Sequence, residues 1–354
     1  MADIRVGVAG YGIRSRALLA ACPAVPELQI CAVTDVDEKN RSAAAAMYPG
    51  VKVFADYLDM LESGLVDAVL LETPPSTHAD FAAAALDAGI HVMSDVPALH
   101  EIGEAKRLWD AAQGSSAVYS FGATTNFWAF VDTCADMRAK GLLGDPVYCE
   151  VDYVADLGDL VIATPWRKHY EPIRYCTHSL GPILKWIGKD LAAVSCMDSG
   201  SHTYGDPEDH EAMVAIFRTA DNTIVKFLAS FVNSHPAPYH RYSYFGTKGF
   251  FERTQPLAGG EPQMLFSTKE LYGLHALTPI SVRESRPELA DAPGVGEHGG
   301  ADYVMLRNFA DCITQGAKPA AGVREALAMT LPGLYAADSA RQGGALVEIH
   351  YPWE

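Results

Sequence analysis

The chain has 354 residues, of which 49% are hydrophobic and 20% are charged, and its net charge at pH 7 is −17. This length predicts two domains rather than one hydrophobic core. The acidic charge excludes nucleic acid as a primary partner and disfavours anionic membranes. The sequence has no apolar run that could span a bilayer and no secretion signal at its start, so we expect a cytoplasmic protein.

Seven cysteines lie far apart in the chain, with no CxxC or CxxH spacing among them. An odd number without such pairs argues against both a disulfide framework and a zinc site. We expect reduced thiols, most of them buried, and no bound metal.

The first third of the chain alternates short apolar runs with helical patterns, which is typical of parallel βαβ units. The predicted strands are Ile4–Ala9, Leu28–Thr34, Ala68–Leu71, His91–Ser94 and Ala117–Phe121. The predicted helical stretches are Arg14–Ala21, Ala43–Met47, His78–Ala88 and Glu101–Ala112. Because such apolar strands need helices on both faces, residues 1–121 are predicted to form a doubly wound parallel sheet of the α/β (Rossmann) class.

Residues 122–354 show a different pattern and are predicted to form an α+β domain with a mostly antiparallel sheet. A helix is expected at Trp128–Lys140, ending before Gly141. The predicted strands are Val147–Val154, Ala212–Arg218, Thr223–Phe231, Arg241–Gly246 and Gly249–Glu252, with a last one near Leu346–His350. The segment Thr254–Gly300, rich in Gly, Pro and charge, is expected to wrap the surface or line the mouth of the site. Helices at Ala301–Thr314 and Arg324–Gln342 could pack back on the first domain.

A cofactor site is predicted where the first strand meets the first helix. Gly10 permits a tight turn there, and Gly12 lets a pyrophosphate approach the backbone, although Ser15 replaces the usual third glycine. Asp35 closes the second strand, where a carboxylate accepts hydrogen bonds from ribose hydroxyls and repels a 2′-phosphate. This favours NAD over NADP. Lys39 and Arg41 are near in sequence, so some binding of NADP is left open. The alternative to a dinucleotide site is an unrelated doubly wound domain in which an aspartate stands at this position by chance.

Four motifs together resemble the glucose–fructose oxidoreductase/inositol dehydrogenase (Gfo/Idh/MocA) family along essentially the whole chain. They are GVAGYG at Gly7–Gly12 with Asp35, DAVLLETPPSTH at Asp67–His78, GIHVMSDVP at Gly89–Pro97 and GTKG at Gly246–Gly249. The resemblance implies NAD as cofactor, a small sugar as substrate and a homo-oligomer, a dimer or tetramer. The cofactor-binding residues that it implies are Gly10, Tyr11, Gly12, Ile13, Arg14, Asp35, Thr73, Pro74, Pro75, His78, Asp95, Pro97, Asn126, Trp166 and Arg167.

The sequence departs from that family at Val96, where ordinary members carry a lysine that assists proton transfer. Valine can neither donate nor accept a proton, so another group must act on the substrate hydroxyl. Tyr175 and His178, in the segment YCTHSLGP, are similar to the catalytic pair of a branch that contains NAD-dependent α-N-acetylgalactosaminidases. Residues three apart on a helix share a face, and a histidine exchanges protons near neutral pH. Without the resemblance to the family, the ordinary interpretation of His178 would be a buried structural histidine.

A run of cations, Arg167-Lys168-His169, precedes that segment in a strongly acidic chain. Arginine offers a fork for a carboxylate or sulfonate, so the run is a candidate site for an anionic sugar; a solvated loop is the equal alternative. Arg174 and His298 are further substrate candidates. Asp206, Glu208, Asp209 and His210 could suggest a metal cluster, but a hydrophilic turn explains them better.

The expected reaction is NAD-dependent oxidation of a hexopyranoside at C3. The branch resemblance favours net glycoside hydrolysis by oxidation, elimination, water addition and reduction, including on an anionic sugar such as a sulfoquinovoside. The glutamate that this branch carries before its Asn-Tyr pair has no counterpart at Ala123–Phe127. A simple sugar dehydrogenase that releases NADH is therefore a rival. A catalytically inactive dinucleotide-binding sensor or structural protein, which Val96 makes conceivable, is the rival outside enzymes.

Overall fold

A computed structural model of the chain describes residues 3–158, 160–203, 205–233, 239–254, 262–274, 276–282 and 297–354. The chain divides into two units. The first comprises Met1–Phe127, Ser285–Leu327 and Trp353, and the second comprises Trp128–Glu284, Ala328–Pro352 and Glu354. The first unit thus extends beyond Phe121, where the sequence placed the boundary, and includes the helix α9 (Ala301–Gln315). Much of the expected surface segment Thr254–Gly300, namely 255–261, 275 and 283–296, lies outside the described residues.

The first unit contains a six-stranded parallel sheet in the order β3-β2-β1-β4-β5-β6. The strands are β1 (Ile4–Ala9), β2 (Leu28–Thr34), β3 (Lys52–Phe54), β4 (Ala68–Leu71), β5 (His91–Ser94) and β6 (Tyr119–Phe121). This confirms the predicted fold class. Strand β3 was missed because it is a short edge strand whose side chains are largely exposed, so it lacks the apolar run that marks β4.

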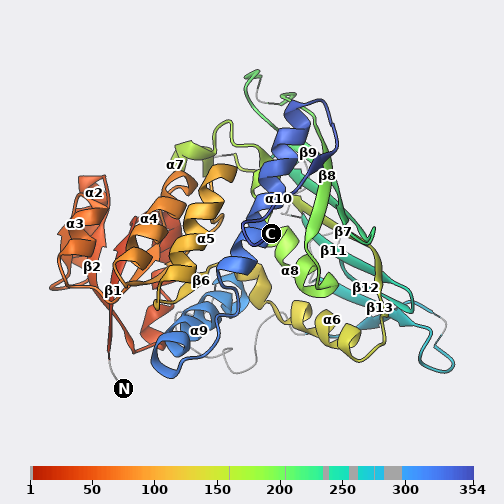
Figure 1. The fold of residues 1–354 in the computed structure, drawn as a ribbon, viewed down its shortest axis with the longest axis horizontal. Helices are drawn as coiled ribbons and strands as arrows, with labels where there is room; N and C mark the ends of the chain where they lie inside the picture. The colour runs from red at the N-terminus through yellow and green to blue at the C-terminus, as the bar shows by residue number, and fades with distance from the viewer. Residues whose placement is uncertain are drawn as a thin grey trace. The chain divides into compact units, whose positions relative to one another are not determined.

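Helices cover the sheet of the first unit, and α4 and α5 lie side by side (Figure 1). They are α1 (Ile13–Leu19), α2 (Glu38–Met47), α3 (Tyr57–Glu62), α4 (Pro75–Asp87), α5 (Ala105–Gly114) and α9, with short 3-10 turns η1 (Cys22–Ala24), η2 (Ile102–Glu104), η3 (Thr124–Phe127) and η7 (Glu297–Gly300). Helix α5 begins later than the predicted Glu101, because Glu101 and Glu104 form a reciprocal capping box around the η2 turn.

The second unit is built on a nine-stranded sheet in the order β14-β13-β12-β11-β7-β10-β9-β8-β15. Only the β7–β10 pair is parallel among the described pairs, as expected for a mostly antiparallel sheet. The strands are β7 (Pro146–Val154), β8 (Leu191–Asp198), β9 (Ala212–Thr219), β10 (Ile224–Ser230), β11 (Tyr239–Gly246), β12 (Gly249–Thr254), β13 (Gln263–Thr268), β14 (Thr278–Ile280) and β15 (Val347–Glu348).

Helix α8 (Thr177–Ile187) packs on β7 and β11 and carries the largest buried side chain of this unit, Trp186. The Trp186 ring makes edge contacts with Phe130 and Phe251, and its Nε1 donates to the carbonyl of Val131 at 2.9 Å. This packing fixes the position of the α8 N-terminus. The other helical segments are α6 (Ala129–Ala139), α7 (Leu160–Ala163), α10 (Val323–Arg341), η4 (Pro165–Arg167) and η5 (Pro172–Arg174).

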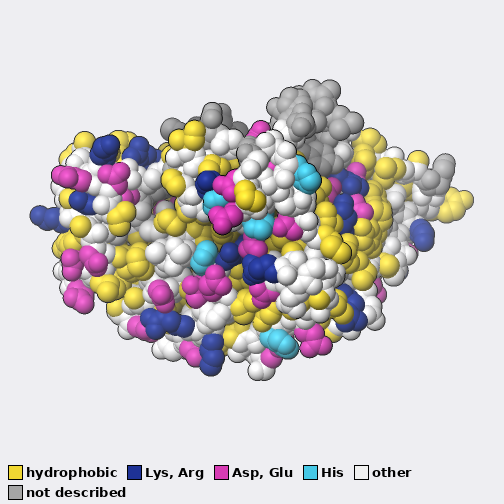
Figure 2. Space-filling model, turned by 90° about the horizontal axis from the view of Figure 1, so that it is seen from above, with side chains coloured by type: hydrophobic (Ala, Val, Ile, Leu, Met, Phe, Trp, Pro, Cys, Tyr) yellow, Lys and Arg dark blue, Asp and Glu magenta, His cyan; other side chains and the backbone are white. Residues whose placement is uncertain are grey.

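The seven cysteines are free, and six of them are buried. In the described parts of the chain, no helix combines the length and the apolar character that a membrane crossing demands. On the face drawn in Figure 2, basic side chains are interspersed with acidic ones.

Candidate functional site

The turn between β1 and α1 leaves its backbone open on one side. Gly10 has a φ of +87°, and a Cβ at this position would lie 2.8 Å from the carbonyl oxygen of Glu72, so only glycine fits without strain. A Cβ at Gly12 would meet no described heavy atom within 4 Å. Ser15, in place of the third glycine, is fully buried, whereas Ile13 in the same turn is exposed. The turn therefore has the free approach that a pyrophosphate requires.

Asp35 lies directly after β2 and is fixed beside this turn. Its Oδ2 accepts a hydrogen bond from the backbone N–H of Tyr11 at 2.7 Å, and its Oδ1 accepts one from the N–H of Asp37 at 2.8 Å. Arg41, which left NADP open in the sequence, donates from Nη1 to the backbone carbonyl of Asp35 at 2.7 Å. The carboxylate that would face a ribose is thus held in place by the backbone.

His78 supports two turns of the same unit. Its Nε2 lies 2.7 Å from the carbonyl oxygen of Thr73, and its Nδ1 lies 2.7 Å from that of Pro97. The side chain is buried within α4, which begins at Pro75 just after Pro74. Both ring nitrogens are therefore occupied by backbone groups, so His78 is placed to hold the two turns together.

Arg14, in the first turn of α1, is surrounded by three carboxylates. Its Nη2 lies 2.8 Å from Oδ1 of Asp302, and its Nε lies 3.4 Å from Asp95 and 4.0 Å from Glu72. The Glu72 and Asp302 side chains are 1% and 3% exposed. On the far side of Asp302, its Oδ2 lies 3.0 Å from Nδ1 of His298. Arg14 thus lies in α1, Glu72 and Asp95 directly follow β4 and β5, His298 lies in η7 and Asp302 lies in the first turn of α9.

The carboxylates of this cluster differ in protonation. Burial, together with the neighbouring Asp95 and Asp302, raises the pKa of Glu72 well above its usual range. Burial alone would also raise the pKa of Asp302, but hydrogen bonds from His298 and Arg14 outweigh it and lower that pKa. Burial therefore favours the neutral form of Glu72, whereas the hydrogen bonds to Asp302 favour its ionised form.

The geometry of the first unit fits NAD. The turn at Gly12 is open, and the Asp35 carboxylate is fixed beside it. The same turn leads to Arg14, whose buried Nη1 atom has no hydrogen-bond partner among the described residues. Asn126 lies in η3, directly after β6. Trp166, by contrast, which the family resemblance grouped with the cofactor residues, lies in η4 of the second unit.

Tyr175 and His178 lie together at the start of α8 in the second unit. The Nε2 atom of His178 is 3.2 Å from the Tyr175 hydroxyl, and the two rings meet edge to face at 5.1 Å. The His178 carbonyl accepts a hydrogen bond from the buried Tyr242 hydroxyl at 2.9 Å, which anchors this turn to β11. Both side chains are half-buried. The sequence-predicted pair is thus in hydrogen-bond contact.

Two residues beside this pair were missed by the sequence analysis. Tyr153 on β7 has its ring centre 5.9 Å from Tyr175 and 6.5 Å from His178. His240, its cross-strand partner on β11, has its ring centre 4.6 Å from Tyr153. Burial, helped by the charge of Arg253, lowers the pKa of His240 to about 4, so its ring is neutral at pH 7. The alternation of apolar and polar residues in Val147–Val154 could have identified Tyr153 as facing the core.

Arg167 stacks on aromatic rings of the same region. Its guanidinium lies 4.1 Å from the ring centre of Trp166 and 5.8 Å from that of Tyr175. No carboxylate of the described residues pairs with it. Arg167 is therefore a cation beside Tyr175 whose charge is not compensated locally.

The two cations that follow are paired with acids. Lys168 Nζ lies 3.1 Å from Asp206, and His169 Nδ1 lies 3.0 Å from Asp209. His169, Asp206 and Glu208 bring their ligand atoms within 4.8 Å of one another. Lys168 and His169 thus lie against the acidic turn that contains Asp206 and Asp209.

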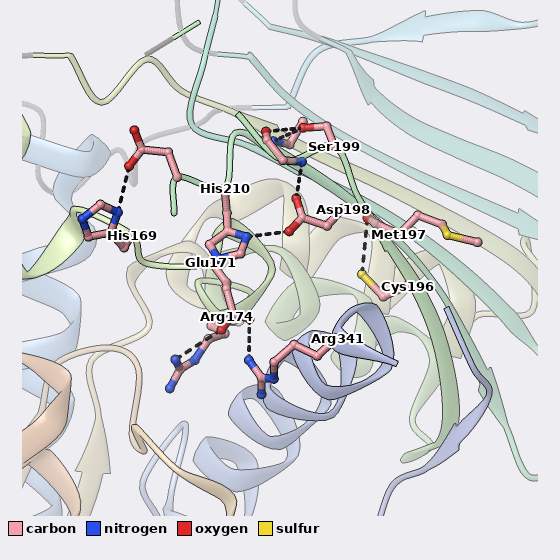
Figure 3. Close-up of polar contacts among 12 residues, drawn as sticks. His169, Glu171, Arg174, Cys196, Met197, Asp198, Ser199, His210 and Arg341 are labelled. Atoms are coloured by element: carbon pink, nitrogen blue, oxygen red, sulfur yellow. Dashed lines mark hydrogen bonds and ion pairs between the residues drawn. The ribbon is translucent and has the colours of Figure 1, made fainter. Parts of the chain in front are cut away.

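Arg174, a sequence-predicted substrate residue, is engaged by Glu171. Figure 3 shows Arg174 and Arg341 both pointing at this buried carboxylate; its Oε2 lies 3.3 Å from Arg174, and its Oε1 lies 2.5 Å from Arg341. His210 pairs instead with Asp198 at 2.5 Å. The arginine charges around Glu171 are thus tied into a structural network.

Residues 4–123 match the family model described as an oxidoreductase family with an NAD-binding Rossmann fold. Among curated proteins, the chain is 28% identical to a glycosyl hydrolase family 109 protein of Saccharopolyspora erythraea, over 98% of this chain and 82% of the relative. It is 26% identical to a protein of the same description from Solibacter usitatus, over 97% of this chain and 86% of the relative.

Solved structures share the fold of both units. A levoglucosan dehydrogenase in complex with NADH and L-sorbose is 16% identical, with a TM-score of 0.82, over 99% of this chain and all of the other. A scyllo-inositol dehydrogenase from Lactobacillus casei, with bound NAD(H) and scyllo-inositol, is 18% identical, with a TM-score of 0.78, over 98% and 99% of the two chains.

Proposed function

We propose that this chain, whose residues 4–123 match the model of an oxidoreductase family with an NAD-binding Rossmann fold, hydrolyses a hexopyranoside through transient oxidation at C3. The observation that carries the proposal is the hydrogen-bonded Tyr175–His178 pair at the start of α8. The similarity to proteins described as glycosyl hydrolase family 109, along nearly the whole chain, supports hydrolysis as the outcome.

Each group has a defined task in this proposal. Gly10, Gly12 and Asp35 would hold the dinucleotide, which when bound accepts the C3 hydride of the sugar and later returns it. His178 accepts the proton of the C3 hydroxyl, and Tyr175 orients its ring through the bond to Nε2. A C3 ketone acidifies the neighbouring C2–H, so loss of that proton expels the group on C1. This route needs no pair of carboxylates of the ordinary glycosidase kind.

The test follows aglycone release and NADH absorbance together, with purified protein, NAD and a panel of hexopyranosides. We expect aglycone release without accumulation of NADH. If no sugar yields either free aglycone or NADH, the proposal is overturned. That result would favour the hypothesis of an inactive dinucleotide-binding sensor, which Val96 suggests.

A sugar dehydrogenase that releases NADH is the second candidate. It is favoured by the sequence Ala123–Phe127, which lacks the glutamate of the glycosidase branch. In the same assay it predicts stoichiometric NADH and an intact glycosidic bond, so the two reactions separate in a single experiment.

The substrate class is proposed to be an anionic hexopyranoside, such as a sulfoquinovoside or a uronide. In the run Arg167-Lys168-His169, Lys168 and His169 contact acidic side chains, whereas Arg167 pairs with no carboxylate of the described residues and lies beside Tyr175. A guanidinium that is stacked on aromatic rings is preorganised to bind a carboxylate or sulfonate in a bidentate way.

A pair of variants tests this assignment. Arg167→Ala should reduce kcat/KM for the anionic glycoside several-fold more than for its neutral counterpart, because a desolvated charge pair loses about 2–5 kcal/mol when one partner is removed. Lys168→Ala, on the adjacent paired cation, is the matched control and should affect both substrates equally. If the wild type acts equally on both substrates and Arg167→Ala changes neither activity, the substrate is a neutral or N-acetylated hexoside instead.

A further inference from the structure

His298 and Asp302 form a pair in which a buried carboxylate orients an accessible imidazole. Asp302 is 3% exposed and lies 3.0 Å from Nδ1 of His298, whose side chain is 41% exposed. A carboxylate accepts hydrogen bonds and donates none when ionised, so Nδ1 must carry the hydrogen. In the neutral ring the basic electron pair is then on Nε2, the arrangement that a histidine base needs.

The pair lies at the sheet edge where a dinucleotide binds. Asp302 also accepts a hydrogen bond from Arg14, whose Nε reaches Asp95 at 3.4 Å, immediately before Val96. These groups stand at the carboxyl ends of β1 and β5, the edge that holds the ligand in open α/β sheets. A sugar that transfers a hydride must lie at the nicotinamide. Val96 offers no proton-transfer group at this edge.

The proposed reaction removes two protons from the sugar, one from the C3 hydroxyl and one from C2. His178, once it holds the first proton, cannot accept the second. The other candidates are unsuitable: the pKa of His240, lowered to about 4 by burial and Arg253, makes it a weak base, and Glu72 is buried. His298 is the accessible imidazole already oriented by a carboxylate.

We propose that His298, positioned by Asp302, is the base that removes the C2 proton, an inference that rests on the proposed function. The C2–H bond breaks, its proton goes to Nε2 of His298, and its electron pair forms the C1=C2 double bond as the C1–O bond breaks. The aglycone oxygen takes the proton held by His178. Water then adds its hydroxide to C1 and gives its proton to His178, while C2 recovers its proton from His298.

Asp302 is a positioning residue in this scheme, and its effect is measurable without turnover. Asp302 accepts from Nδ1 of His298 on one side and from Arg14 on the other. In cofactor-free protein, 15N NMR of the His298 ring should show the Nδ1–H tautomer in the wild type and a larger share of the Nε2–H tautomer in Asp302→Ala. The same tautomer in both proteins would remove Asp302 from this role.

The deciding experiment measures hydrogen–deuterium exchange at C2 of the sugar in D2O, beside aglycone release and the Kd of NAD. His298→Ala and His298→Gln should each slow exchange and release at least about a hundredfold, with NAD affinity within about twofold. His100→Ala is the matched control. The inference would be overturned if both His298 variants exchanged the C2 hydrogen at the wild-type rate. It would also be overturned if the variants lost only their affinity for NAD. Absence of exchange in the wild type would instead overturn the proposed function.

Discussion

The Nε2 atom of His178 lies 3.2 Å from the hydroxyl oxygen of Tyr175, three residues earlier in the chain. If this pair performs the first proton transfer, His178→Ala should lower kcat at least about a hundredfold. The Kd of NAD should barely change, because the groups that fit the dinucleotide belong to the first unit. Steady-state kinetics and a fluorescence titration of NAD check both parts. His202→Ala, on an exposed loop, is the control, and near-normal turnover of His178→Ala would show that the pair is structural.

Asp35 should determine the choice of dinucleotide, because its ionised carboxylate repels a 2′-phosphate. The wild type should bind NAD more than roughly tenfold tighter than NADP, a difference of at least about 1.4 kcal/mol. Asp35→Ala should narrow this ratio in equilibrium titrations. Asp37→Ala removes a carboxylate that instead caps α2 and should leave the ratio unchanged. Equal affinities in the wild type are the contrary result.

The two glycines of the cofactor turn should respond differently to alanine. Gly10→Ala forces a left-handed residue against the carbonyl of Glu72, so it should lower both Tm and NAD affinity. Gly12→Ala projects into open space and should keep the wild-type Tm while weakening NAD binding. Differential scanning calorimetry with and without NAD separates these effects. A normal Tm for Gly10→Ala would contradict the contact.

His240 should make folding stability depend on pH. The unfolded chain protonates this residue below about pH 6.5, whereas the folded chain does so only below about pH 4, so stability falls as the pH drops between these values. His240→Gln should lose less stability over this window, by at most about 3 kcal/mol. Urea unfolding at pH 7 and pH 5 measures the difference, with the exposed His350→Gln as control. If both variants lose the same free energy of unfolding between pH 7 and pH 5, a residue other than His240 causes the pH dependence.

Arg14 and Glu72 should contribute unequally to stability. Arg14→Met leaves the buried Asp302 carboxylate with less compensation and should lower the free energy of unfolding by about 3–5 kcal/mol. Glu72→Gln should lower it by less, because burial raises the pKa of that carboxyl and favours its neutral form, which the glutamine amide resembles. Urea unfolding at pH 7 compares the two. A large loss in Glu72→Gln would mean that the carboxylate is ionised.

The parallel sheet could be predicted from the sequence because its strands are apolar on both faces. The bounds of β1, β2, β4 and β5 agree with the predicted ones for this reason. Strand β3 exposes Lys52 and Val53 and therefore carries no such signal. Strand β8 was missed too: Gly188 ends α8 just before it, but the run Leu191–Cys196 contains two alanines, which are depleted in strands, and so gives a weak strand signal.

The candidate site was only partly predictable. Gly10, Asp35 and the Tyr175–His178 spacing depend on local sequence and could be proposed from motifs. The pairing of Asp302 with Arg14 spans 288 residues, and that of His240 with Tyr153 depends on strand register. The neutralisation of Lys168 by Asp206 likewise depends on two loops that meet only in the folded chain. Such contacts carry no signal in a single sequence.

The first unit is discontinuous, and this has a consequence for biosynthesis. Its Rossmann strands leave the ribosome within the first 121 residues, but Asp302 arrives only after the polar turns and strands of the second unit have been made. Until then, Arg14 lacks its closest carboxylate. The first unit therefore cannot complete its packing before α9 has been synthesised. A chain truncated after Phe127 should therefore expose α9's packing surface and aggregate or recruit chaperones, even though it contains every glycine of the cofactor turn.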